Sequence, residues 1–121
     1  MIGDWSDWIK GINLKELKMA DGMEQIGHKD DDHKIRLDLI PPEVIMEIGK
    51  VLTFGAIKYA PNNWQQLPNF NRRYYAAALR HLMAWRMGED FDKESGLLHL
   101  SHALTCLAFL TWKAYHSEEK N

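Results

Sequence analysis

Residues Arg80 to His102 read RHLMAWRMGEDFDKESGLLHLSH and join two segments whose apolar spacing is typical of helices. Three of the six histidines in the chain, His81, His99 and His102, fall in this stretch together with four acidic residues. Gly88 lies between the two segments, and a loop through it lets the second helix run antiparallel to the first. The stretch therefore predicts a helix-loop-helix corner at which imidazoles and carboxylates converge.

The spacing of the histidines predicts a metal site at this corner. His99 and His102 are three residues apart, which puts both imidazoles on one helix face. The antiparallel return brings His81 beside them, and Asp92 or Glu94 can add a carboxylate oxygen. The alternative interpretation is a solvated helix face beside an ordinary acidic loop. Leucines surround the two histidines on the following helix, which favours a polar site inside a cavity.

The composition indicates one small soluble domain of 121 residues. With 15 basic and 17 acidic residues and a net charge of -2, the chain lacks the broad basic surface that duplex nucleic acid requires. Cys106 is the single cysteine, so no intrachain disulfide can form, and we expect an inert thiol and a reducing, cytoplasmic setting. We find no apolar stretch long enough to span a bilayer and no signal-peptide pattern.

Residues 1–33 differ from the rest and are predicted to form an N-terminal amphipathic segment with a charged linker. Apolar residues recur there at helical spacing, at Trp5, Trp8, Ile9 and Ile12. The run from His28 to Lys34 is typical of a solvated linker, although its histidines and aspartates are also possible metal ligands. Residues 34–121 are then expected to form the helical domain that carries the function.

Within that domain we predict an all-α fold, an antiparallel bundle of three main helices. Their apolar stripes suggest helices from Pro42 to Lys58, from Arg72 to Met87 and from Glu94 to Tyr115. The third helix is apolar on nearly every side, and two neighbouring helices cannot cover it fully. We therefore expect a homodimer or a higher homo-oligomer in which a partner chain completes the core.

The turn after the first helix carries groups suited to a nucleotide. Lys58 is a cation for phosphate, Asn63 has an amide that can read a base edge, and Tyr59 and Trp64 offer rings for stacking. A structural turn held by aromatic packing is an equally good interpretation of this segment.

The second helix and the acidic loop supply the remaining candidates. Arginines for phosphate contacts are Arg72, Arg73 and Arg80. Glu94 is the first candidate to orient or deprotonate an attacking water, and Asp92 and Glu89 are the alternatives.

Several motifs in this order resemble one known family. They are Arg36-Leu37-Asp38-Leu39-Ile40-Pro41-Pro42, Gly55-Ala56-Ile57-Lys58-Tyr59 with Asn63-Trp64, Arg80-His81-Leu82, and Gly88-Glu89 through Asp92, Glu94-Ser95-Gly96, His99 and His102-Ala103. The chain resembles, over residues 34 to 112, the N-terminal domain of the dATP/dGTP diphosphohydrolases, which are common in phage and prophage genomes. The resemblance implies a small helical domain that hydrolyses purine deoxynucleoside triphosphates.

A more distant resemblance is to the all-α nucleoside triphosphate pyrophosphohydrolases, the MazG-like and dimeric dUTPase enzymes. Those enzymes bind magnesium through E-x-x-E on one helix and E-x-x-D on the next. In this chain residues 78–81 and 99–102 stand at those places, and they carry histidines instead of carboxylates. Histidine ligation favours manganese, iron, nickel or zinc over magnesium, which prefers oxygen.

Together these features predict a metal-dependent hydrolase that converts dATP or dGTP to the monophosphate and pyrophosphate. A divalent ion, manganese, magnesium or another transition metal, would activate water for attack at phosphorus. The alternative is a nucleotide-binding protein without turnover, a sensor or a sequestering module that uses the same cavity. A purely structural interaction domain is the third interpretation.

Overall fold

The computed structural model describes residues 33–116, and the described part contains three α-helices, two 3-10 helices and no β-strand. The α-helices are α3 (Pro42–Lys58), α4 (Phe70–Arg86) and α5 (His99–His116). The prediction of an all-α helical fold is confirmed. The predicted N-terminal helix and the charged run up to Asp32 lie outside the described residues.

Residues 33–39 belong to a separate unit and are described by themselves. Their one regular element is the 3-10 helix η1 (Leu37–Leu39). Arg36 forms an ion pair with Asp38 at 2.7 Å, and this hydrogen bond holds the pKa of the Asp38 carboxyl below its usual value. The helical body begins at Ile40.

α3 has the predicted bounds because both of its ends are marked in the sequence. Pro42 stands in the first turn, where its fixed φ suits a helix and its missing N–H has no partner to lose. At the other end the Tyr59 amide donates to the Gly55 carbonyl at 2.9 Å. The chain then turns through Asn62, at a φ of 62°, into the short 3-10 helix η2 (Asn63–Gln66).

α4 lies close to its predicted place and ends in a well-defined cap. Gly88 has a φ of 100°, and the Glu89 amide donates to the Ala84 carbonyl at 3.0 Å, the pattern of a Schellman motif. This cap stops the helix at Arg86 and sends the chain into the acidic loop.

α5 begins five residues later than predicted, at His99 instead of Glu94. Residues 92–97 form a turn closed by a β-bridge between Phe91 and Leu98. Gly96 has a φ of 74°, which no helical residue adopts, and the His99 amide donates to the Asp90 carbonyl at 2.8 Å. The acidic residues therefore lie in an ordered loop before the helix.

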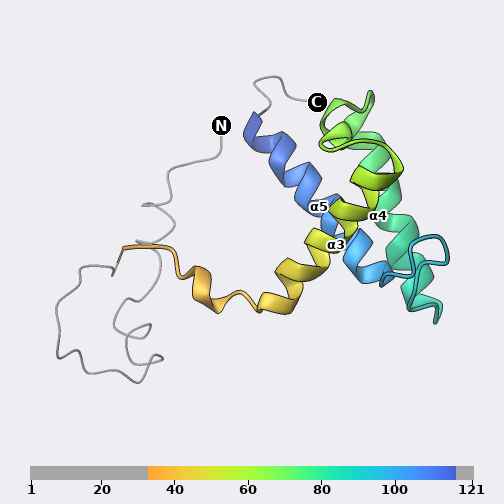
Figure 1. Cartoon of the computed structure of the whole chain (residues 1–121), viewed down its shortest axis with the longest axis horizontal. Helices are drawn as coiled ribbons and strands as arrows, with labels where there is room; N and C mark the ends of the chain where they lie inside the picture. The colour runs from red at the N-terminus through yellow and green to blue at the C-terminus, as the bar shows by residue number, and fades with distance from the viewer. Residues whose placement is uncertain (1–32, 117–121) are drawn as a thin grey trace. The chain divides into compact units, whose positions relative to one another are not determined.

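α5 is the element on which the other two α-helices pack, and α4 and α5 run antiparallel (Figure 1). Ala78 of α4 and Ala103 of α5 are each 2 % exposed, and such small side chains allow two helices to approach closely. Glu47 ties α3 to α5 by accepting a hydrogen bond from the buried Ser101 hydroxyl at 2.8 Å.

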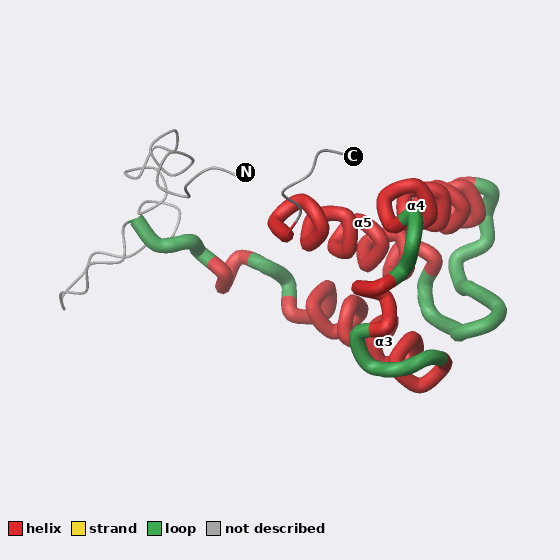
Figure 2. The backbone as a smooth tube through the Cα atoms, turned by 90° about the horizontal axis from the view of Figure 1, so that it is seen from above, coloured by secondary structure: helices red, strands yellow, loops and turns green. Residues whose placement is uncertain are grey.

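Two loops flank the helices, one after α3 and one between α4 and α5 (Figure 2). Beside the first loop lies an aromatic cluster of Trp64, Phe70, Tyr74, Phe109 and Trp112. In its centre the Trp64 and Phe109 rings stack at 4.1 Å between centroids. This cluster fixes the loop against α4 and α5.

Many apolar side chains of the helices stay on the surface. No residue of α3 is buried, and on α5 Leu100 and Leu107 are 40 % and 49 % exposed. In the part of the chain from 33 to 116, no helix combines the length and the apolar character needed to cross a bilayer.

Candidate active site

A cluster of two imidazoles and one carboxylate lies where α4, α5 and the acidic loop meet. Ligand atoms of His81, Asp92 and His99 all lie within 4.8 Å of one another. α4 supplies His81, the first residue of α5 is His99, and Asp92 comes from the loop between them. The predicted convergence of His81 and His99 is thus present in the structure, with Asp92 as the neighbouring carboxylate.

His99 is held from both sides of its ring. Its Nδ1 lies 2.9 Å from the Nδ1 of His81, and its Nε2 lies 3.1 Å from Oε1 of Glu89. Because only 5 % of His99 is exposed, these two contacts and the packing around them fix the ring in one orientation.

His102 is engaged with Ser95 and stacks on the cluster from the side. Its Nε2 lies 2.7 Å from the Ser95 hydroxyl and 3.8 Å from Oδ2 of Asp92. Its ring stacks on that of His81, with 4.6 Å between the centroids and 12° between the planes. In the structure its Nε2 contacts the loop, and His102 is not one of the three clustered residues. Its role as a metal ligand stays a prediction.

Ser95 organises the loop around Asp92, and the sequence analysis gave it no role. Its amide and its hydroxyl both donate to Oδ2 of Asp92 at 2.9 Å, and its oxygen accepts a hydrogen bond from the Leu97 amide at 3.1 Å. Oδ1 of Asp92 lies outside these hydrogen bonds. The spacing Asp-x-x-Ser, typical of a side chain that closes its own turn, was the signal that could have revealed this.

The protonation states suit a metal site. Burial and the neighbouring His102 and His99 lower the pKa of His81 to about 4, and burial also lowers the pKa of His102. Burial raises the pKa of the Asp92 carboxyl, but the hydrogen bonds from Ser95 outweigh it and hold that pKa below its usual value. At neutral pH the His81 imidazole is therefore uncharged, with one ring nitrogen free of a proton, and Asp92 is ionised, which are the forms that bind a metal ion.

The donor set fits a divalent transition metal. Two imidazole nitrogens and one carboxylate oxygen are the ligands typical of manganese, iron or zinc sites, whereas magnesium is usually bound by oxygen alone. His81, Asp92 and His99 are the residues that would hold such an ion.

A pocket of about 620 Å³ lies beside the cluster, between the end of α3, the following loop, α4 and α5. Five of the seven predicted substrate contacts line it, namely Lys58, Tyr59, Asn63, Trp64 and Arg73, whereas Arg72 and Arg80 do not. His102 lines it as well, so one side chain borders both the pocket and the histidine cluster.

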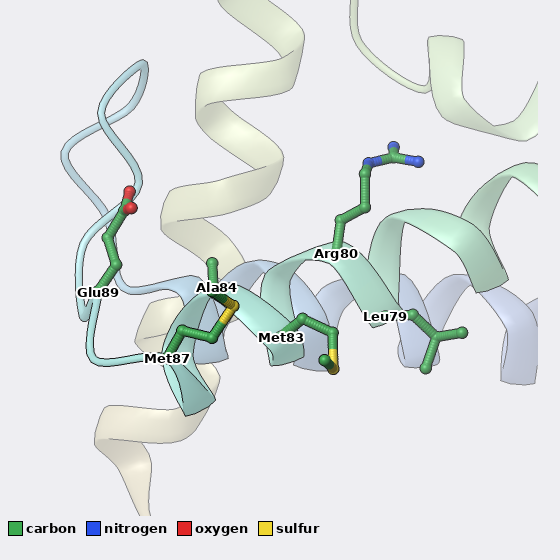
Figure 3. A pocket seen from close by; sticks show the side chains of 6 residues that line it. All are labelled: Leu79, Arg80, Met83, Ala84, Met87 and Glu89. Atoms are coloured by element: carbon green, nitrogen blue, oxygen red, sulfur yellow. The ribbon is translucent and has the colours of Figure 1, made fainter.

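Arg80, one of the two predicted substrate contacts outside this pocket, lies at a different surface. It borders a hollow of about 590 Å³ on α4 together with Leu79, Met83 and Glu89. Figure 3 shows Arg80 pointing away from Leu79 and Met83. Arg80 is therefore not among the residues that line the pocket beside the cluster.

One face of α5 forms a wall of the pocket that the sequence analysis missed. It consists of His102, Thr105, Cys106 and Phe109, spaced i, i+3, i+4 and i+7. That spacing was visible in the sequence and could have placed all four beside the predicted loop. Burial raises the pKa of the Cys106 thiol to about 11, which agrees with the expected inert thiol.

The two aromatic residues predicted to stack a base differ in their surroundings. Trp64 already stacks on Phe109 and contacts the edge of Trp112 at 4.8 Å between centroids. Tyr59 lines the pocket and is 65 % exposed. Trp64 therefore fits the alternative interpretation, a structural turn held by aromatic packing. Tyr59 keeps a ring surface that a ligand can reach.

Glu94 lies apart from the three-residue cluster and forms an ion pair with Lys58. This contact raises the pKa of Lys58. The Glu94 charge still acts on the imidazole of His102, since it is among the charges that oppose the lowering of the His102 pKa by burial. The first candidate base thus contacts the lysine of the pocket, and its charge acts on the histidine that borders the cluster.

Comparison with known proteins places these features in a family. Residues 24–121 match the family described as dATP/dGTP diphosphohydrolase, N-terminal. The chain belongs to this family. It is also similar to a curated relative named "dATP/dGTP diphosphohydrolase" from Salmonella phage PMBT28, at 38 % identity over 86 residues. The match covers 71 % of this chain and 29 % of the relative, so the chain spans less than a third of the relative's length. No solved structure matches the chain.

Proposed function

We propose that this domain hydrolyses purine deoxynucleoside triphosphates, dATP or dGTP, to the monophosphate and pyrophosphate with the help of a divalent metal ion. One observation carries the proposal: the histidine and carboxylate cluster and the pocket with its cations and aromatic rings meet at His102. The family and the printed name of the phage relative support the choice of substrate.

In the proposed reaction a water molecule attacks the α-phosphorus. An oxygen–phosphorus bond forms, the bond from the α-phosphorus to the bridging oxygen breaks, and pyrophosphate leaves with the electron pair. Glu94 takes the proton of the attacking water. A divalent ion bound by His81, Asp92 and His99 would supply Lewis acidity for this chemistry.

Lys58 and Arg73 are the proposed phosphate contacts, because both line the pocket. Lys58 and Glu94 are 40 % and 58 % exposed, and an ion pair in such contact with water is weak. Phosphate oxygens can therefore replace Glu94 at the Lys58 ammonium. That exchange would free the Glu94 carboxylate as the nucleotide enters. Tyr59 then stacks on the base, and the Asn63 amide contacts its edge.

The test is an assay of pyrophosphate and phosphate release from dATP and dGTP, with manganese, zinc and magnesium compared. We expect pyrophosphate as the product and a higher rate with manganese than with magnesium. Release of single phosphate, or equal rates with and without added metal after chelation, would contradict the proposal.

Arg73 and its neighbour offer a matched pair for testing the pocket. We expect Arg73→Gln to weaken dATP binding about tenfold or more, because a charge-assisted phosphate contact is worth about 1.5–3 kcal/mol. Isothermal titration calorimetry with dATP measures this directly.

Arg72→Gln is the control, since it removes the same charge one position away and Arg72 does not line the pocket. It should bind dATP as the wild type does. If both variants lose affinity equally, the effect comes from the general charge of α4, and the pocket is not the phosphate site.

We also propose that the domain associates with a second copy of itself. Large apolar side chains remain exposed on all three helices, among them Ile57 at 82 %, Met83 at 57 % and Leu107 at 49 %. Surfaces of this kind favour association. We expect light scattering at micromolar concentration to give about twice the chain mass of 14.1 kDa. A mass equal to one chain under the same conditions would contradict the dimer.

A further inference from the structure

Glu89 touches the cluster only through His99. Its Oε1 lies 3.1 Å from Nε2 of His99, and the side chain is otherwise 44 % exposed while that of His99 is 7 % exposed. An ionised carboxylate can only accept hydrogen bonds. For the contact to be a hydrogen bond, Nε2 of His99 must therefore carry the proton.

This contact determines which nitrogen of His99 faces the cluster with a lone pair. A neutral imidazole carries one proton, so a proton on Nε2 leaves Nδ1 unprotonated. Nδ1 lies 2.9 Å from Nδ1 of His81, and in the metal-free protein His81 then donates the hydrogen between them. His99 is held ready to present Nδ1 to an ion.

The Glu89 carboxylate does not stabilise the end of α4, as its position in the chain shows. The residue follows the end of α4 as part of the Schellman cap, with its amide bound to the Ala84 carbonyl. Negative charge near the C-terminal end of a helix is unfavourable because the helix dipole is negative there. The cap holds the backbone of Glu89 in place, so its carboxylate needs little further ordering to reach His99.

We propose that Glu89 is a positioning residue that fixes the Nε2–H tautomer and the orientation of His99. The part of this proposal that concerns metal binding rests on the function proposed above. The part that concerns the tautomer of His99 is independent of that function. This role differs from that of a base, for which Glu89 was one of the candidates. Carboxylates that accept a hydrogen bond from a ligating imidazole commonly raise metal affinity ten- to hundredfold.

The first experiment measures the tautomer without metal. Long-range proton–nitrogen NMR of the imidazole nitrogens, on the metal-free protein at about pH 8, should show His99 protonated at Nε2 in the wild type. Glu89→Ala should shift His99 towards a mixture of both tautomers. Asp90→Asn, which removes one charge at the next, exposed position, should leave the His99 signals unchanged. A wild-type His99 protonated at Nδ1 would overturn the proposal.

The second experiment measures manganese affinity by calorimetry. Glu89→Ala should weaken binding of Mn²⁺ ten- to hundredfold, whereas Glu89→Gln should stay within about threefold of the wild type because its amide oxygen still accepts from Nε2. Asp90→Asn serves as the control for charge. A loss in Glu89→Gln as large as in Glu89→Ala would mean that Glu89 acts through its charge, which contradicts the positioning role. If the wild type binds no metal, the proposed function fails, and the tautomer measurement still decides the inference.

Discussion

Replacing His99 with alanine is expected to lower the affinity for manganese by at least about a hundredfold, since losing a ligand should cost more than losing a partner that only orients one. His99 is buried, lies in the cluster with His81 and Asp92, and has its ring fixed on both sides. Elemental analysis after dialysis should therefore find metal in the wild type and only background in His99→Ala. Circular dichroism should show the same helical content in both proteins.

Two further histidines sharpen this measurement. His116 lies exposed at the end of α5, where its Nδ1 bonds to the Trp112 carbonyl at 2.9 Å, so His116→Ala should keep the full metal content. A His102→Ala variant tests whether His102 belongs to the metal ligands. The structure favours the set of His81, Asp92 and His99, and His102→Ala should then retain most of the metal. Loss of metal in His102→Ala would restore His102 as a ligand, and full metal in His99→Ala would contradict the site.

The helices could be predicted where the sequence marks their ends by local chemistry. Pro42 fixes the start of α3, and Gly88 ends α4 by taking up the positive φ of the cap. The start of α5 could not be found in this way, because apolar residues continue from Leu97 into the helix. The competing turn depends on a side-chain contact between Asp92 and Ser95 and on a bridge from Phe91 to Leu98.

The residues of the candidate site also differ in whether the sequence alone could predict their positions. Spacing alone was enough to bring His81 and His99 together, because a tight return between two helices leaves few alternatives. It could not decide between Asp92 and Glu94 as the nearby carboxylate. That choice follows from the turn, which points Asp92 inward and leaves Glu94 to Lys58, a residue 36 positions away in the chain.

Glu94→Gln is expected to lower the rate of pyrophosphate release by a factor of about a hundred or more while nucleotide binding is retained. Glutamine keeps the size of the side chain and an oxygen that can face Lys58, but it cannot take a proton from water. Because the ion pair with Lys58 is lost, the lysine becomes freer for phosphate, and dATP affinity should stay equal or rise slightly. Rates measured with saturating dATP and manganese, alongside calorimetric affinities, separate the two effects.

The same variant separates a hydrolase from a protein that only binds nucleotides. A sequestering protein has no rate to lose, so in that case Glu94→Gln changes affinity alone. If the wild type binds dATP tightly and releases no product with manganese, zinc or magnesium, the hydrolase proposal fails and the binding function replaces it. If Glu94→Gln turns over at the wild-type rate, Glu94 is not the base. The base must then be sought at Asp92 or Glu89. Asp92→Asn would also remove a carboxylate from the cluster. Only a loss of rate at unchanged metal content would therefore identify Asp92 as the base.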